Sequence, residues 1–145
     1  EAKKNLPDAP SKGEPSAKPL PAAKQQSPIS GQIELLTPTK GVDFKSYLSR
    51  LLVTVRRNWF ALVPESARLG EKGRVVVQFQ ILRDGRIPEA NVRLAASSGK
   101  QPLDEAALLS VRRSSPLEPL PPAFSEPFIE LRFIFLYNLP LEAAR

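Results

Sequence analysis

The sequence contains no cysteine and no histidine. Without cysteine there is no disulfide framework, no thiolate zinc site and no thiol nucleophile. Without histidine there is no imidazole to act as a general base near neutral pH or to bind a metal. We therefore expect no catalytic site and no bound metal or other cofactor. A carboxylate-only site for a hard cation such as calcium is the one metal chemistry left open.

Methionine is also absent, and no apolar run approaches the roughly 18 residues that suggest a membrane span. We therefore do not expect these 145 residues to cross a membrane themselves. Because no initiator methionine is present, we expect a processed protein or an excised fragment.

Glycine is scarce and proline is abundant, at 7 and 16 residues, and the prolines crowd into residues 1–40. This segment is also nearly free of aromatic side chains, so it cannot bury enough apolar surface to offset the entropy of ordering. We expect a Pro-rich linker over residues 1–40, disordered over about residues 1–30, and one folded domain over residues 41–145. Residues 32–36 could alternatively form a short strand that packs on the domain.

The folded part begins with a helical pattern and continues with a hairpin. Apolar residues at steps of three and four predict a helix over residues 43–60, with Asp43 as its N-cap. Residues 74–82 alternate with period two and predict a strand. The Asp84-Gly85 dipeptide then predicts a hairpin turn, followed by a second strand over about residues 87–96.

A second helix and a last strand complete the domain. Residues 102–113 open with proline and two acids and close with two arginines, which suits a helix dipole. A proline-rich crossing over residues 114–127 leads to a strand over residues 128–137. The predicted fold class is α+β, with two helices packed on a three-stranded antiparallel sheet. The expected core consists of Val75, Val77, Phe79, Ile81, Val92, Leu94, Phe133 and Phe135.

The sequence lacks the residues that catalysis or nucleic-acid binding would need. Asp84, Asp104 and Glu130 have structural explanations in a turn, a helix start and a strand face, and there is no Gly-rich phosphate loop. The net charge of +6 is spread along the chain, and the arginine pairs at 56–57 and 112–113 are expected to be solvated helix ends. Exposed aromatic residues for base stacking are wanting. The sequence predicts neither an enzyme nor a nucleic-acid-binding protein.

Four stretches in a fixed order resemble a known family. They are WFALVPESA, GRVVVQFQILRDGRIPEANVRLAASSG, LDEAALLSVRRSSP and a closing aromatic strand. Together they are similar to the C-terminal domain of TonB-type energy transducers, whose outline the C-terminal domain of TolA shares. The resemblance covers about residues 43–138. The chain lacks the short Gln-Pro-x-Tyr-Pro element of well-known TonB proteins.

The resemblance implies a protein of the Gram-negative envelope that works in the periplasm. A TonB-type protein is anchored in the inner membrane by a segment that would precede Glu1, and it transfers proton-motive energy from inner-membrane motor proteins to an outer-membrane transporter. The partner would be a short peptide segment of that TonB-dependent transporter. The alternative is a TolA-like envelope-integrity module without a transport role, and a homodimer formed edge to edge is a further option.

The expected binding mode is β-augmentation, in which an extended peptide pairs with an exposed sheet edge. Because only residues 138–145 follow it, the strand over residues 128–137 is expected to be that edge, with Glu130 and Arg132 setting register and preference. A groove near Trp59 and Pro64 is the other candidate. The expected partner-binding residues of the strand are Phe128, Glu130, Arg132, Ile134 and Leu136.

Overall fold

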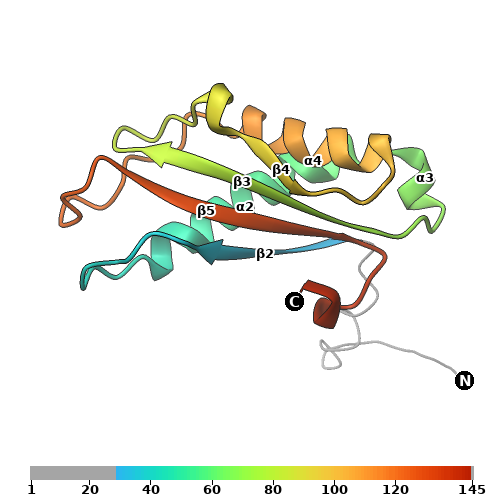
Figure 1. Cartoon of the computed structure of the whole chain (residues 1–145), viewed down its shortest axis with the longest axis horizontal. Coiled ribbons are helices and arrows are strands. Elements are labelled where there is room, and N and C mark those ends of the chain that lie inside the picture. Colours follow the sequence, from blue (N-terminus) through green and yellow to red (C-terminus); the bar gives the residue numbers. More distant parts are fainter. Residues whose placement is uncertain (1–28, 145) are drawn as a thin grey trace, which may run out of the picture.

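The structure, a computed structural model, describes residues 29–144 of the chain. It confirms an α+β fold, in which the helices α2 (Lys45–Leu62) and α4 (Gln101–Arg113) pack on one face of an antiparallel sheet. Figure 1 shows the sheet in the order β2-β5-β3-β4 with both helices on the same side. Of the linker expected over residues 1–40, residues 1–28 lie outside the described residues, whereas Ile29–Leu35 form a strand of the sheet, so the folded domain includes residues before the expected start at 41.

The sheet has four strands, so the prediction of three is wrong. The additional strand is β2 (Ile29–Leu35), which pairs with β5 (Phe128–Tyr137) from Ile29 opposite Tyr137 to Leu35 opposite Leu131. Residues 29–35 do alternate, because every second side chain faces the helices. The inward-facing positions hold only three apolar residues and one glycine, which is a weak alternating pattern. Prolines 28 and 38 flank the segment in the sequence, so its composition resembles that of the linker.

Helix α2 forms close to the predicted range, because its apolar residues recur at the helical period, but its N-cap is Phe44, so the prediction of Asp43 as N-cap is wrong. Asp43 lies one residue before the N-cap Phe44, and its carboxylate accepts a hydrogen bond from the Lys45 N–H at 2.9 Å. The chain then passes through Pro64 into the short helix α3 (Glu65–Arg68). The buried stripe of α2 consists of Tyr47, Leu51, Val55 and Trp59.

The predicted hairpin forms between β3 (Gly73–Leu82) and β4 (Arg93–Ala96), and its second strand is shorter than expected. Pro88 and the 3₁₀ turn η2 (Glu89–Asn91) keep the chain off the ladder before β4 begins. Gly85 has φ +97°, where side chains are disfavoured, and a Cβ there would collide with the carbonyl of Leu117.

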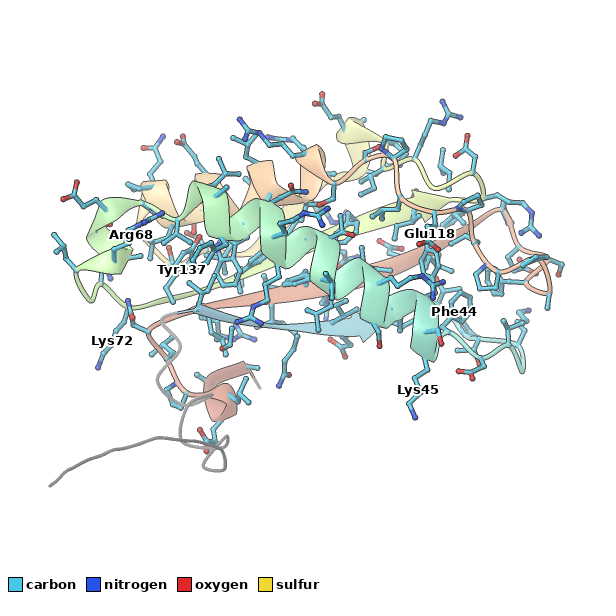
Figure 2. The ribbon with its side chains drawn as sticks, turned by 180° about the vertical axis from the view of Figure 1, so that it is seen from behind. Phe44, Lys45, Arg68, Lys72, Glu118 and Tyr137 are labelled. Carbon is cyan, nitrogen blue, oxygen red and sulfur yellow. The ribbon has the colours of Figure 1, made fainter. Side chains whose placement is uncertain are left out.

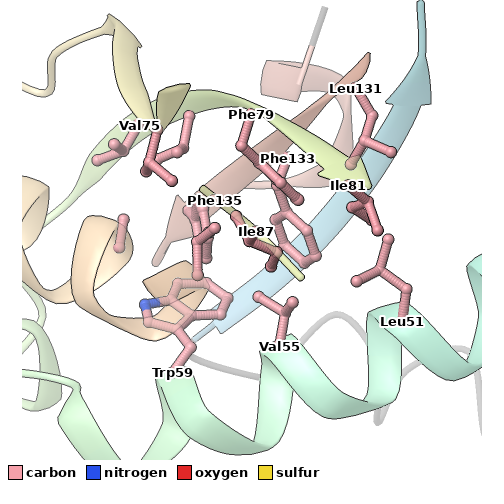
Figure 3. Packing of buried hydrophobic residues seen from close by; sticks show 14 of the residues in the cluster. Leu51, Val55, Trp59, Val75, Phe79, Ile81, Ile87, Leu131, Phe133 and Phe135 are labelled. Atoms are coloured by element: carbon pink, nitrogen blue, oxygen red, sulfur yellow. The ribbon is translucent and has the colours of Figure 1, made fainter. Parts of the chain in front are cut away.

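The core lies between the sheet and the two helices (Figure 3). Seven of the eight residues expected there are buried, and Leu94 is the exception at 37% exposed. Leu94 lies on the edge strand β4, whose pairing with β3 contains a register shift between Val76 and Val77. Trp59 stands at the centre, edge-to-face against Phe135 with ring centroids 4.8 Å apart.

Asp104 is a buried carboxylate with a structural task in the first turn of α4. It accepts hydrogen bonds from the Ser98 N–H at 2.9 Å and the Ser98 hydroxyl at 2.8 Å, and also from the Ser97 hydroxyl. These bonds hold the loop before α4 against the helix start, where a negative charge is favoured by the helix dipole. The structure thus agrees with the structural explanation that the sequence suggested for Asp104 at a helix start.

Candidate functional site: the free edge of the sheet

Strand β5 is not an edge of the sheet, so that prediction is wrong. It lies between β2 and β3 and pairs with both over most of its length. The last strand in the sequence had seemed open because only a few residues follow it, but a segment from before the first helix returns to cover it. Strand order depends on pairing between distant segments, which a period-two pattern does not encode.

The backbone of β5 is divided between its two neighbours. In an antiparallel ladder, alternate residues turn both backbone groups to the same side. The Leu36 N–H donates to the Glu130 carbonyl at 2.8 Å, and the Glu130 N–H donates to the Thr37 hydroxyl at 2.7 Å. The even-numbered residues of β5 therefore turn towards β2, and the N–H of Ile134 belongs to the internal ladder.

The five residues expected to bind a partner do share one face of β5, the face turned away from the helices. Phe128, Glu130 and Arg132 are partly exposed there. Ile134 and Leu136 are buried, at 7% and 0% exposed, in a small second cluster under the C-terminal turn η3 (Leu141–Ala144). Their burial removes these two side chains from direct contact with a partner.

Charged and polar side chains form a continuous ladder across this outer face, one or two from each strand. Glu34 Oε1 lies 3.5 Å from Arg132 Nη1, and Arg132 Nε donates to Gln78 Oε1 at 3.3 Å. Gln78 Nε2 donates to Glu130 Oε2 at 2.7 Å, and Arg93 Nη2 lies 3.9 Å from the same oxygen. Glu130 and Arg132 thus contact residues of this chain, and the ladder ends at the sheet edge with Glu34.

The free edge of the sheet on this side is β2. Because the even residues of β2 turn towards β5, the backbone groups of Gly31, Ile33 and Leu35 turn outward. Within residues 29–144, no hydrogen bond is found for these outward groups, whereas the Ile29 carbonyl accepts one from Arg56 Nη2 at 3.4 Å. Gly31 cannot be replaced freely, because a Cβ would lie 2.5 Å from the ring of Phe133.

The opposite edge of the sheet is protected in ways that β2 is not. Strand β4 has four residues, against seven in β2, and its pairing contains a register shift. Short, irregular edge strands are poor templates for another chain. Strand β2 pairs in unbroken register and is the longer, more regular edge.

Trp59 does not line a surface groove. Its side chain is fully buried, and its indole Nε1–H donates to the Tyr137 hydroxyl at 2.8 Å, which in turn donates to the Leu103 carbonyl at 2.8 Å. Burial raises the pKa of the Tyr137 hydroxyl, so the group remains a neutral donor. Pro64 is half-buried at the junction of α2 and α3.

No cluster of three or more acidic side chains that could hold a metal ion occurs among residues 29–144. Over the same residues, no helix has the length and apolar character needed to span a bilayer. Along β2 the geometry offers backbone donors and acceptors, the groups that pair with an extended polypeptide in β-augmentation.

Comparison with known families now identifies the fold. Residues 64–136 match the family described as Gram-negative bacterial TonB protein C-terminal. The chain belongs to the TonB C-terminal family. The solution structure of the Helicobacter pylori TonB C-terminal domain matches with 24% sequence identity and a TM-score of 0.46, over 68% of this chain and 85% of that one. No curated protein sequence matches.

TonB C-terminal domains are periplasmic, non-enzymatic domains that interact with outer-membrane transporters in general. The matched residues run from Pro64 to Leu136 and so include β3, β4, α4 and nearly all of β5. Strand β2 and helix α2 lie outside them. Strand β2, which pairs with the strand that was expected to be the docking edge, is therefore outside the matched part of this TonB-family chain.

Proposed function

We propose that this domain transfers inner-membrane proton-motive energy to an outer-membrane transporter by binding a short, extended transporter segment along the free edge of β2. Family membership supports a TonB-type role. The observation that carries the docking site is the row of outward backbone groups at Gly31, Ile33 and Leu35. Each backbone hydrogen bond of this kind contributes about 0.5–1.5 kcal/mol.

The position of β2 suits a domain that transmits a pull. Strand β2 directly follows residues 1–28, the segment that would lead back towards the inner membrane. A segment paired with β2 would thus be linked to residues 1–28 through one strand. The other side of this strand pairs with β5 in unbroken register. A load applied to the partner would be shared among several parallel hydrogen bonds.

Glu34 gives the edge a side-chain preference. It is exposed on the outer face at the end of the charged ladder, with one carboxylate oxygen 3.5 Å from Arg132. A strand added beside β2 would place alternate side chains on that face, next to Glu34 and Gln32. A basic or hydrogen-bond-donating residue opposite Glu34 would therefore be favoured, and an acidic one disfavoured.

The test is a proline at Ile33, compared with an alanine at the same position. Both variants shorten the half-buried side chain, but only Ile33→Pro removes an N–H that turns to the free edge. The probe is a synthetic peptide of the periplasm-exposed segment of a TonB-dependent transporter, titrated calorimetrically against the whole chain. We expect Ile33→Pro to weaken binding about fivefold relative to Ile33→Ala, the effect of one hydrogen bond.

If the two folded variants bind the peptide with equal affinity, β2 is not the docking edge. A peptide that fails to bind the unaltered chain, together with binding of another envelope protein along the same edge, would favour the TolA-like envelope-integrity module instead. Amide protection of residues 29–35 shows whether β2 stays paired with β5 in both variants.

A further inference from the structure

The outer face of α2 carries a stripe that no part of the described chain covers. Phe60 and Val53 are 62% and 61% exposed, although both are large apolar residues. They lie seven residues apart, with Arg56 and Arg57 between them, so the four occupy one helix face at steps of three and four. Figure 2 views the molecule from this side, with α2 in front of the sheet.

The surroundings of this stripe are basic. Helix α2 contains Lys45, Arg50, Arg56 and Arg57 and no acidic residue. Asn58 Nδ2 donates to Ser114 Oγ at 2.9 Å, and each of these residues directly follows an arginine pair. The bond joins α2 to the residue that follows α4, whose last two residues are Arg112 and Arg113, whereas Arg56 reaches the Ile29 carbonyl on β2. Among residues 29–144, Arg57, Arg112 and Arg113 form no ion pair.

Two adjoining hollows follow the same helix. One, of about 320 Å³, is a shallow and open depression between the four side chains of the stripe, and the other, of about 240 Å³, lies between α2 and the crossing at residues 116–118. Arg57 lines both. In the second hollow Arg50 is already paired with Glu118 at 2.9 Å, which shows that a carboxylate fits among these guanidinium groups.

We propose that the outer face of α2 binds an acidic amphipathic helix of a partner protein, as a second interaction surface separate from the β2 edge. Exposed aromatic and arginine side chains together are typical of protein interfaces, and arginine binds carboxylates through two parallel hydrogen bonds. Apolar residues seven positions apart match the repeat of a docked helix.

Two other occupants fit this surface less well. A second copy of the chain docking through the same stripe would place arginines against arginines. A lipid surface prefers a broad apolar face flanked by basic residues, whereas here the arginines separate the two apolar side chains.

The experiment titrates the whole chain with a designed helical peptide. This peptide carries leucine at every seventh position and glutamate at the third and fourth positions after each leucine. The matched peptide has glutamine in place of glutamate. We expect the acidic peptide to bind and the neutral one to bind at least tenfold more weakly, with affinity falling as salt is added. Arg57→Gln and Phe60→Ala should each weaken binding about tenfold.

Lys45→Gln is the matched control, because it removes one exposed charge from the same helix about 18 Å from Arg57 along the axis. It should change affinity less than twofold. Equal binding of both peptides, or losses that do not depend on Arg57 and Phe60, would overturn the proposal. So would Phe60-dependent binding to phosphatidylglycerol vesicles in the absence of peptide binding, which would assign the surface to lipid. Ile33→Pro should leave this binding unchanged, so the two surfaces are tested separately.

Discussion

The two faces of the sheet are built from the same strands and differ in almost every physical respect. On the helix side, β3 and β5 present side chains that are all fully buried, including Phe79, Phe133 and Phe135. On the other side the sheet carries the charged ladder, which runs from Glu34 on β2 to Arg93 on β4, and one small apolar cluster under η3. The inner face stabilises the fold, and the outer face and its edge remain for recognition.

Removing a ring from the inner face should give the largest effect. Phe133 is fully buried, and its ring centroid lies 4.4 Å from that of Phe135. The ring also fills the space beside Gly31. We expect Phe133→Ala to lower the free energy of unfolding by about 3–5 kcal/mol, measured by urea denaturation, because it leaves a cavity in a packed core. A loss below about 2 kcal/mol would mean that β2 collapses into the space.

Alkaline pH should weaken the inner face selectively. Burial, followed by the nearby charge of Glu118, raises the pKa of Tyr47 to about 12, and burial also raises the pKa of Tyr137. Both hydroxyls remain neutral in the folded protein, whereas in the unfolded chain they ionise near pH 10. Their stabilising contribution is therefore complete below pH 10 and is lost as pH rises above it.

At pH 11 we expect a loss on the order of 1 kcal/mol for each tyrosine relative to pH 9. The measurement is urea unfolding at both pH values. Tyr47→Phe is the control: it removes the hydrogen bond to the Glu118 carbonyl and lowers stability at neutral pH, but it should roughly halve the alkaline loss. An undiminished alkaline loss in this variant would assign the effect to other groups.

The same substitution on opposite faces of one strand compares them directly. Ile129 is fully buried beneath the helices, and Ile134 is 7% exposed beneath η3. We expect Ile129→Ala to cost about 4 kcal/mol and Ile134→Ala about 2 kcal/mol in urea unfolding, since the thin cover of η3 can relax around the smaller side chain. Equal costs would show that η3 is as firmly packed as the helices.

The sequence predicted the inner face well, because alternation and helical period report burial on one side. Both long helices, the hairpin turn at Gly85 and the core parity of β3 and β5 are confirmed. The continuous apolar run at residues 133–137 was a sign of burial on both faces, but the turn η3 that covers Ile134 and Leu136 has no strong pattern of its own.

The candidate site was harder to predict than the fold. Residues 29–35 resemble the preceding linker in composition, and the position of a strand within a sheet depends on contacts nearly a hundred residues away. Phe128–Tyr137 therefore seemed to be the edge when it is the centre. The outward parity of Glu130 and Arg132 was predicted correctly, but their partners Gln78, Glu34 and Arg93 lie on three other strands.

Breaking the outer ladder should give the smallest effect on stability. Arg132 contacts Glu34 at 3.5 Å and Gln78 at 3.3 Å in a position open to solvent, where ion pairs contribute little. We expect Arg132→Gln to lower the free energy of unfolding by less than about 1 kcal/mol, and by still less at 1 M salt, where charges are screened over roughly 3 Å. A double-mutant cycle with Glu34→Gln isolates the pair. A coupling above about 2 kcal/mol that persists in salt would make the outer face as structural as the inner one, and Glu34 would then be held too firmly to select a docked strand.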